Sequence, residues 1–520
     1  MYLNPAVLAK TLWQSFQPIH ILYGIVAYCI WKVFYEVYLS PLSHIPGPLW
    51  YRITSLPLLI HELRGDEPEL MIKLNKKYGG LFVITPRRVA ICDPKDSQII
   101  LGTHAFLKDK RYSNVEVMQP NTFLTVDPEL NKQRRRQIGP IMSLANLKHM
   151  EPIILEAGTK QLYNKWDRDI AHAGEKHKAR ICYYDDLMLM TFDIISTLGF
   201  GQKHMSLTSG DTHIAKSVGS TLVIIFFESI LPFFKTKLFR QHIAKSLYGK
   251  FDAFFALCTD AINNRKKLLS GLQPNEDKPK DLLQAFIDAE DPESRIRMTS
   301  DQVVTETIIS LLAGSDTSSN TMTWTIHLLL LHPHYLARVV KEVREAFGRD
   351  HIINYSESKA SLRFLEACIY ESLRLIPVVT GMPRRMPTGG ATLHGYFIPE
   401  GYNCSVSIAA INTNPEVWER PYEFFPERFL KNEAIKRQVL TFSTGVRVCP
   451  GKNLAWMEIH STMANIFNKY DLELPEDVLF TPDRVDKHGQ PITMPRMAAA
   501  TYVPRFPERD CVVLISKRSD

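Results

Sequence analysis

The chain has 520 residues, of which 45% are hydrophobic and 22% are charged, and its formal net charge is +7. These proportions are ordinary for a globular protein, and the length is ample for a large core. Neither a nucleic-acid-binding motif nor a basic stripe with interleaved aromatic residues is present, so we expect no nucleic-acid partner. Solvated faces are expected to explain most of the short basic runs at 108–111, 132–136 and 265–267, while docking of a partner or contact with an anionic membrane surface stays open for one patch. No low-complexity block or internal repeat divides the chain, which favours one large unit.

The eight cysteines are scattered along the chain, without the spacing of a zinc site. They also lack the pattern of a disulfide framework. We therefore expect the bulk of the chain to face a reducing compartment.

An apolar segment covers residues 19–39 and follows a short N-terminal tail, residues 1–18. Its length of about 20 residues is enough to span a bilayer as a helix. Lys32 and Glu36 interrupt it, but they lie one helical turn apart and can pair or snorkel. No small-residue cleavage site follows, which argues against a removed signal peptide. The segment is predicted to be a retained single-pass anchor, with a buried or membrane-surface helix as the alternative.

Residues 40–50 contain three prolines, Pro41, Pro46 and Pro48. Proline fixes φ and is excluded from helix interiors. This segment is predicted to be a rigid hinge between the anchor and the main domain, residues 51–520.

The main domain is predicted to be mainly helical with a minor β region. A helix at 68–78 precedes two short strands, 81–85 and 88–92, and residues 187–269 have a helical pattern with an apolar centre at 222–234. A long helix is expected at 301–331, with Thr299 or Ser300 as its N-cap. A further helix ends before Pro377, a strand and hairpin follow within 377–399, and a last helix covers 452–470.

Residues 442–451, FSTGVRVCPG, gather one thiol, one guanidinium and two glycines just before that last helix. The thiolate of Cys449 could donate electron density to a haem iron, which favours cleavage of an O–O bond. Gly445 can adopt positive φ, and Gly451 has no Cβ to obstruct close approach of the backbone. The fork of Arg447 suits a haem propionate, and Phe442 offers an apolar face that shields the sulfur. For a lone cysteine the ordinary alternative is a small buried hydrophobe.

The middle of the long helix, residues 313–318, reads AGSDTS. A glycine in mid-helix costs about 1 kcal/mol relative to alanine, and the hydroxyl and carboxyl side chains compete for backbone hydrogen bonds. A local opening there could admit dioxygen beside the iron, with the Thr317 hydroxyl placed to hydrogen-bond it and Asp316 linked to a proton path. Taken alone, the pattern equally suits a plain irregularity of the helix.

These stretches together resemble the cytochrome P450 superfamily. Residues 442–451 match its FxxGxRxCxG signature at every fixed position, and their Cys-Pro-Gly ending is similar to that of many fungal members. Residues 313–318 match its (A/G)Gx(D/E)T(T/S) pattern, which assigns Ala313 and Gly314 to the cofactor. The ExxR and PERF motifs of the family are matched at Glu371, Arg374 and Arg428, which implies a structural Glu-Arg-Arg network. Glu371 and Arg374 are spaced i, i+3 and therefore share a helix face.

The resemblance also assigns weaker positions. Arg135 matches the arginine of a WxxxR or HxxxR motif that binds a haem propionate, although Asn131 replaces the aromatic residue. Either Arg384 or Arg385 would contact a propionate, and the doublet leaves that choice open. The substrate is expected to meet Val378, Val379 and Thr380. The apolar region within 187–269 would form a roof over the substrate and dip into the membrane.

The activity that the resemblance implies is monooxygenation on haem b, with Cys449 as axial ligand of the iron. One atom of O2 would enter a lipophilic small molecule, by hydroxylation or epoxidation in secondary, steroid, terpenoid or lipid metabolism, and the other would leave as water. The chain has no GxGxxG or flavin motif. NADPH and flavins are therefore expected to act only through a membrane-bound NADPH–cytochrome reductase, with cytochrome b5 as a second candidate donor. The implied location is the endoplasmic reticulum membrane, with the catalytic domain in the cytosol.

Two other activities stay open at this point. A haem-thiolate isomerase or dehydratase would need neither oxygen nor reductase, but such members usually lack the pair formed by Asp316 and Thr317. The second is a membrane-anchored haem protein that only binds ligands.

Overall fold

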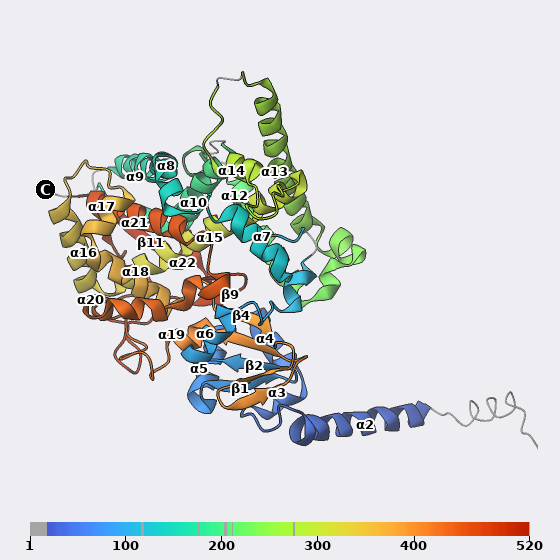
Figure 1. Cartoon of the computed structure of the whole chain (residues 1–520). Coiled ribbons are helices and arrows are strands. Elements are labelled where there is room, and N and C mark those ends of the chain that lie inside the picture. The colour runs from blue at the N-terminus through green and yellow to red at the C-terminus, as the bar shows by residue number, and fades with distance from the viewer. Residues whose placement is uncertain are drawn as a thin grey trace, which may run out of the picture.

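The computed structural model describes residues 18–115, 119–174, 177–201, 205–210, 212–273 and 276–518. Within these ranges a large helical part and a smaller β-rich part lie side by side, and α2 (Pro18–Phe34) projects from the β-rich part (Figure 1). The predicted class, mainly α with a minor β region, is confirmed. The predicted tail, residues 1–18, lies outside the described residues apart from its last one.

Along the chain, helices stand before, between and after the strands of the β-rich part. Besides α2, the α-helices of the described residues are α3 (Leu49–Ile53), α4 (Leu56–Arg64), α5 (Glu67–Tyr78), α6 (Pro94–Gly102), α7 (Pro128–Ile138), α8 (Leu144–Ile154), α9 (Lys160–His172), α10 (Tyr183–Phe200), α11 (Ser206–Ser209), α12 (His213–Ile230), α13 (Lys245–Gly271), α14 (Leu282–Asp288), α15 (Ser300–Leu331), α16 (Pro333–Ala346), α17 (Tyr355–Ser361), α18 (Arg363–Leu375), α19 (Ile408–Asn412), α20 (Glu427–Lys431), α21 (Lys452–Lys469) and α22 (Pro507–Asp510).

The four-stranded sheet has the order β1 (Leu81–Thr85), β2 (Arg88–Ile91), β7 (Asn403–Ser407), β4 (Gly381–Arg385). β2 and β7 are parallel, and the other neighbours are antiparallel. Smaller sheets pair β3 (Ala179–Cys182), β11 (Val512–Lys517) and β8 (Tyr470–Glu473), then β5 (Ala391–Leu393) with β6 (Tyr396–Ile398), and β9 (Arg496–Ala498) with β10 (Tyr502–Pro504). The predicted strands at 81–85 and 88–92 and the hairpin within 377–399 are thus observed.

Both faces of the β1–β2 pair are buried, because side chains alternate between two cores. Leu81 and Val83 face one core, which also contains Leu42 and Ile45 of the predicted hinge. The opposite face, with Phe82, packs under α3, α4 and α5. The hinge is therefore part of the β-rich core up to Pro48, and α3 begins at Leu49 within the range predicted for it.

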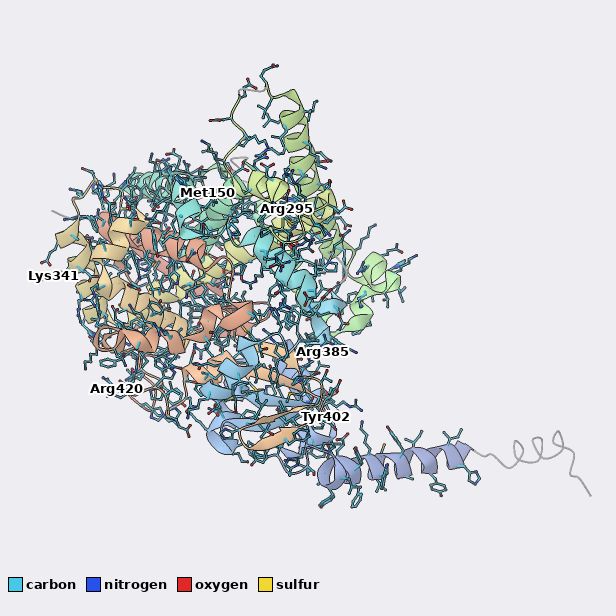
Figure 2. The ribbon with its side chains drawn as sticks, viewed as in Figure 1. Met150, Arg295, Lys341, Arg385, Tyr402 and Arg420 are labelled. Atoms are coloured by element: carbon cyan, nitrogen blue, oxygen red, sulfur yellow. The ribbon has the colours of Figure 1, made fainter. Side chains whose placement is uncertain are left out.

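The segment predicted to be the anchor, residues 19–39, is helical. α2 continues into a π-helical turn, η1 (Tyr35–Leu39), and the 20-residue span His20–Leu39 is long and apolar enough to cross a membrane. No part of that span is buried within the protein, and its side chains point outward on all sides (Figure 2). α12 passes the same test of length and composition, but 41% of its window is buried.

The apolar region around 222–234 has two environments. Ile224 of α12 is fully buried, whereas Phe233 in the following 3-10 turn, η5 (Pro232–Lys235), is 52% exposed. A π-helical turn, η6 (Phe239–Ile243), then leads to α13. The helical pattern of 187–269 is thus confirmed, and only part of its apolar centre belongs to the core.

α15 runs through the middle of the helical part and packs against α10, α18 and α21. It begins with a capping box, in which the Thr299 hydroxyl accepts from Gln302 N and the Gln302 side chain accepts from Thr299 N. The prediction for 301–331 and its N-cap is confirmed. A Cβ on Gly314 would lie only 3.0 Å from Ile195 on α10, so the glycine permits this close packing.

Candidate active site

Cys449 lies on the loop between a 3-10 turn, η9 (Gly445–Arg447), and the start of α21. Its backbone N–H donates to the Phe442 carbonyl at 2.8 Å, which closes the loop. Gly445 has φ +64°, and a Cβ there would lie 2.5 Å from the Cα of Gly102 at the end of α6. Glycine is therefore required both for the turn and for the contact with α6. These restraints fix the position of the thiol.

Opposing effects act on the pKa of the half-buried Cys449 thiol. Burial raises its pKa, while the N–H groups of Gly451 and Lys452 and the charge of Arg135 favour the thiolate. A Cβ on Gly451 would meet only the sulfur, at an ordinary 3.9 Å, so its predicted role toward a cofactor stays a prediction. Phe442 packs against Trp456 with ring centroids 5.9 Å apart.

Four buried or half-buried cations converge beside this loop: Lys108, Arg135, Arg384 and Arg447. Arg135 donates from Nη2 to the Val448 carbonyl at 2.5 Å. Burial, together with the charges of Arg384 and Arg135, lowers the pKa of Arg447 to about 10. Among the described residues no carboxylate pairs with any of the four, and Arg447 Nη1 and Arg135 Nε have no hydrogen-bond partner. Buried donors of this kind call for an anionic partner from outside the chain.

The expectation of solvated basic runs is wrong for three of their members. Lys108 is 6% exposed, Arg134 is 1% exposed and Arg265 is 6% exposed. Lys108 donates to the Phe123 carbonyl, and Arg265 pairs with Asp281 at 2.5 Å. Sequence reasoning missed Lys108 as a site residue, because a lysine within a basic run carries no signal of burial.

Asn131 on α7, which stands where the family motif has an aromatic residue, makes its contact with Thr122. It is fully buried, and its Nδ2 donates to the Thr122 carbonyl at 3.2 Å. The N–H of Thr122 in turn donates to Glu306 on α15 at 2.8 Å, and Arg134 Nε lies 3.5 Å from the same carboxylate oxygen. Asn131 therefore belongs to a buried cluster that joins α7 to α15.

α15 has one open face at mid-length. Ala313 is exposed, and Gly314, Asp316 and Thr317 are half-buried, in a helix whose neighbouring residues are buried. The Thr317 hydroxyl donates to the Ala313 carbonyl at 2.6 Å. This side-chain bond shares the carbonyl with the helical backbone bond, and α15 stays a continuous helix through this open face.

Asp316 has a partner that the sequence did not reveal. The hydroxyl of Thr501, between β9 and β10, donates to Asp316 Oδ2. Burial raises the pKa of Asp316, and hydrogen bonds from Thr501 and Asn320 offset part of the rise. The two residues are 185 positions apart, so no local pattern could have joined them.

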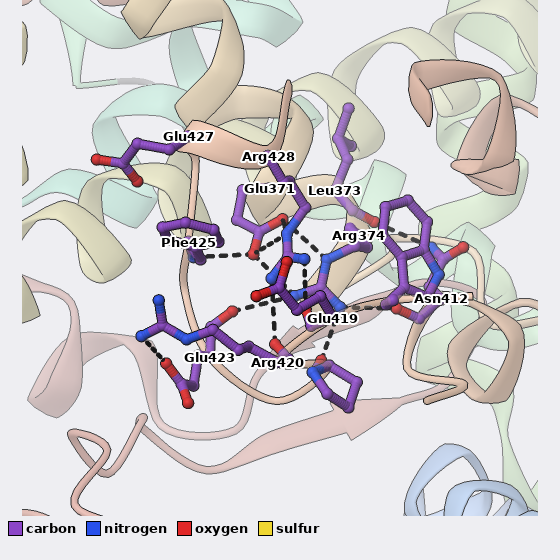
Figure 3. A network of polar contacts seen from close by, with 12 residues as sticks. Glu371, Leu373, Arg374, Asn412, Glu419, Arg420, Glu423, Phe425, Glu427 and Arg428 are labelled. Atoms are coloured by element: carbon purple, nitrogen blue, oxygen red, sulfur yellow. Dashed lines mark hydrogen bonds and ion pairs between the residues drawn. The ribbon is translucent and has the colours of Figure 1, made fainter. Parts of the chain in front are cut away.

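The predicted Glu-Arg-Arg network is present as a set of contacts (Figure 3). Glu371 accepts two bonds of 2.8 Å from Arg374 and bonds of 3.1 and 3.2 Å from Arg428. Arg374 also donates to the carbonyls of Asn412 and Pro421. Glu371 and Arg374 are fully buried, so this brace ties α18 to α20 and to the segment before it.

Residues 45–493 match the cytochrome P450 family. The chain belongs to that family. Its relatives include two cytochrome P450 monooxygenases of Aspergillus fumigatus: helB1, 39% identical over 92% of this chain and 83% of that protein, and helB2, 38% identical over 96% and 99%. Among solved structures, the haem domain of cytochrome P450DA shares the fold, with a TM-score of 0.73 at 20% identity over 88% of this chain and 95% of that one. The enzyme class of the chain is therefore monooxygenase.

Membership of the cytochrome P450 family implies a haem, and the residues present fit one. Cys449 would supply a thiolate ligand, and the four cations would supply donors for two propionates. Of the arginine doublet on β4, Arg384 is 2% exposed and its charge acts on Arg447 and Lys108. Arg385 instead donates from Nε to the Lys108 carbonyl at 2.9 Å. Figure 2 places it where the β-rich and helical parts meet.

The predicted substrate segment of this P450 lies between α18 and β4. Val378 is 3% exposed, whereas Val379 and Thr380 are half-buried. The Val378 carbonyl accepts from Tyr502 N at 2.9 Å, next to Thr501. This contact brings the predicted substrate segment and the partner of Asp316 into one region.

Proposed function

We propose that this P450 inserts one oxygen atom from O2 into a lipophilic small molecule, with haem b held by Cys449. The observation that carries the proposal is the group of cations beside the Cys449 loop, where Arg135 contacts the backbone of Val448 and Arg447 has a buried donor without a partner. A thiol flanked by donors suited to two carboxylates matches the chemistry of a haem-thiolate centre. Arg135, Arg384, Arg447 and Lys108 are the residues that would hold the propionates.

Haem supplies the activation of dioxygen when it is bound. The chain supplies the proton path. The hydroxyl of Thr317 lies at the open face of α15, and Asp316 lies beside it with its carboxylate held by Thr501. A carboxyl group whose pKa burial has raised can hold a proton and deliver it toward this face, where a hydroxyl that accepts it must release its own proton in turn. Ala313 and Gly314 leave that face free of bulk.

The substrate is proposed to be lipophilic because the half-buried side chain of Val379 is apolar, and the neighbouring Val378 is bonded through its backbone to the hairpin that carries Thr501. Steroid, terpenoid, fatty acid and polyketide all satisfy this requirement, and hydroxylation and epoxidation are both open.

We place the enzyme on the endoplasmic reticulum membrane with the catalytic domain in the cytosol. The exposed α2 supports this location. Beyond it, Leu49, Trp50 and Leu56 are each more than half exposed and extend the apolar surface. Electrons are proposed to come from NADPH through a separate membrane-bound reductase, with cytochrome b5 as a second candidate.

The test is a screen of lipophilic compounds with the enzyme, NADPH and reductase in membranes, read by mass spectrometry. A mass increase of one oxygen atom that needs NADPH and reductase is the expected result. Turnover without either would favour the isomerase or dehydratase, and spectral binding of compounds with no product would favour a protein that only binds ligands.

The ferrous carbon-monoxide spectrum tests the iron ligand separately. Cys449→Ala should lose the red-shifted band of thiolate ligation, while Cys29→Ala, an exposed cysteine on α2, should retain it. A red-shifted band in Cys449→Ala would refute the assignment.

A further inference from the structure

The C-terminal hairpin, β9 and β10, reaches the middle of α15. Its register pairs Tyr502 with Ala498, so residues 499–501 form the turn, and Ala499 N donates to the Thr501 carbonyl at 3.0 Å. From this turn the Thr501 hydroxyl donates to Asp316 Oδ2. The acid of the proposed proton path is thus bound by a segment distant in sequence.

The hairpin is held on three sides. Trp324 on α15 donates from Nε1 to the Tyr502 carbonyl at 3.1 Å, and Tyr502 N donates to Val378. On the far side Ala498 N donates to the Gly65 carbonyl at 2.8 Å. Trp324 and Tyr502 are at most 1% exposed, so the turn cannot shift without breaking buried contacts. The position of the Thr501 hydroxyl is therefore set by the fold.

We propose that Thr501 is a positioning residue for Asp316: its hydrogen bond orients the Asp316 carboxyl, so that a proton is delivered toward the open face of α15, where the Thr317 hydroxyl can relay it by releasing its own proton. The proposal rests on the proposed function, since it concerns the same acid. Thr501 donates its hydrogen bond and transfers no proton itself. Asn320, one turn further along α15, donates to the Asp316 backbone carbonyl at 2.8 Å and helps to fix the main chain.

The hydrogen bond has a measurable consequence for the charge of Asp316. A hydroxyl that donates to a carboxylate stabilises the ionised form, so its loss raises the pKa of that carboxyl. Within the part of the chain that the structure describes, Tyr184 on α10 also senses Asp316, since its own pKa is raised by burial and by this carboxylate. Tyr184 stays neutral at working pH and does not compete in the titration.

The same turn connects the acid to the substrate segment. Because Tyr502, the residue after Thr501, donates from its backbone N–H to the Val378 carbonyl, one buried hydrogen bond joins the turn to the predicted substrate segment. Thr501 therefore lies between the predicted substrate segment and Asp316.

Thr501→Val removes the donor and nearly retains the shape, and Thr501→Ser retains the donor. The haem-loaded proteins are titrated by infrared spectroscopy, with Asp316→Asn identifying the band of the protonated carboxyl. A hydrogen bond to a charged group corresponds to about one pH unit. We expect the carboxyl of Thr501→Val to titrate about one pH unit higher than that of the wild type, and Thr501→Ser to titrate close to the wild type. Thr236→Val, at an exposed threonine, is the control.

A second readout is the hydrogen peroxide released per NADPH consumed with reductase, which should rise several-fold in Thr501→Val and little in Thr501→Ser. An unchanged infrared titration in Thr501→Val overturns the proposal. If Thr501→Val lacks haem, Thr501→Ala takes its place, and loss of haem in both shows a structural role and also overturns it. The infrared titration needs no turnover, so it separates this proposal from the proposed function, which the carbon-monoxide spectrum and the screen test.

Discussion

The guanidinium of Arg374 meets the carboxylate of Glu371 through two parallel contacts, Nε to Oε2 and Nη2 to Oε1, each 2.8 Å long. Both side chains are fully buried, and the second arginine, Arg428, contacts the same carboxylate. A buried pair of this kind need not add net stability, yet loss of one member leaves an uncompensated charge.

Glu371→Ala should therefore be strongly destabilising. The expected loss is about 3–5 kcal/mol of unfolding free energy, because two buried guanidinium groups lose their common anion. Haem incorporation should fall with it, as the brace connects α18 to the segment that precedes the Cys449 loop. Denaturant unfolding and haem content are the measurements. Arg363→Ala, which breaks an exposed pair with Glu433, should cost at most about 1 kcal/mol. Normal haem content in Glu371→Ala would contradict the architectural role.

Gly445→Ala should disturb the Cys449 loop. Its positive φ and the 2.5 Å approach to Gly102 leave no room for a Cβ, so we expect a cost well above about 1 kcal/mol and reduced haem content. The matched control is Gly249→Ala in α13, where a Cβ would meet no atom within 4 Å. That substitution should be neutral or stabilising, since alanine favours helix. Equal thermal stability of the two variants would contradict the requirement for glycine at position 445.

Arg384→Ala and Arg385→Ala form a matched pair for propionate binding. Arg384 acts on the buried cations around Arg447, whereas Arg385 is engaged with the Lys108 backbone. We expect haem to dissociate faster from Arg384→Ala than from Arg385→Ala, because only the former loses a donor for a propionate. Transfer of haem to an apoprotein acceptor measures both rates. Faster loss from Arg385→Ala would reverse the assignment.

Glu306 should make stability depend on pH. Burial raises its pKa from 4.5 to about 7, against the hydrogen bonds from Thr122 and the charge of Arg134. The folded state therefore retains a proton that the unfolded chain releases. This contribution to stability is complete below a pH of about 4.5 and is lost as the pH rises through about 7.

Glu306→Gln should remove that slope. Between a pH of about 5 and about 8, its unfolding free energy should fall less than that of the wild type. Denaturant unfolding at several pH values measures the difference, and Glu473→Gln, an exposed carboxylate, serves as control. Parallel pH profiles of Glu306→Gln and wild type would show that Glu306 does not hold the proton.

Local sequence patterns were sufficient to predict many helices and strands of this enzyme. The helix α15 and its cap at Thr299, the strands β1 and β2, and the helix before Pro377 all follow from periodicity and from residues that start or stop helices. The contacts of Glu371 with Arg374 were predictable for the same reason, because i, i+3 spacing places both side chains on one face.

Contacts between distant segments decided the rest. Thr501 reaches Asp316 only because the chain returns as a hairpin, and Lys108 joins Arg447 only because β4 lies beside it. Asn131 donates a hydrogen bond to Thr122, which in turn donates to Glu306. This role could not be predicted from the residue type. Burial of a charge or an amide depends on which elements pack over it, and that packing is a property of the whole fold rather than of any local stretch.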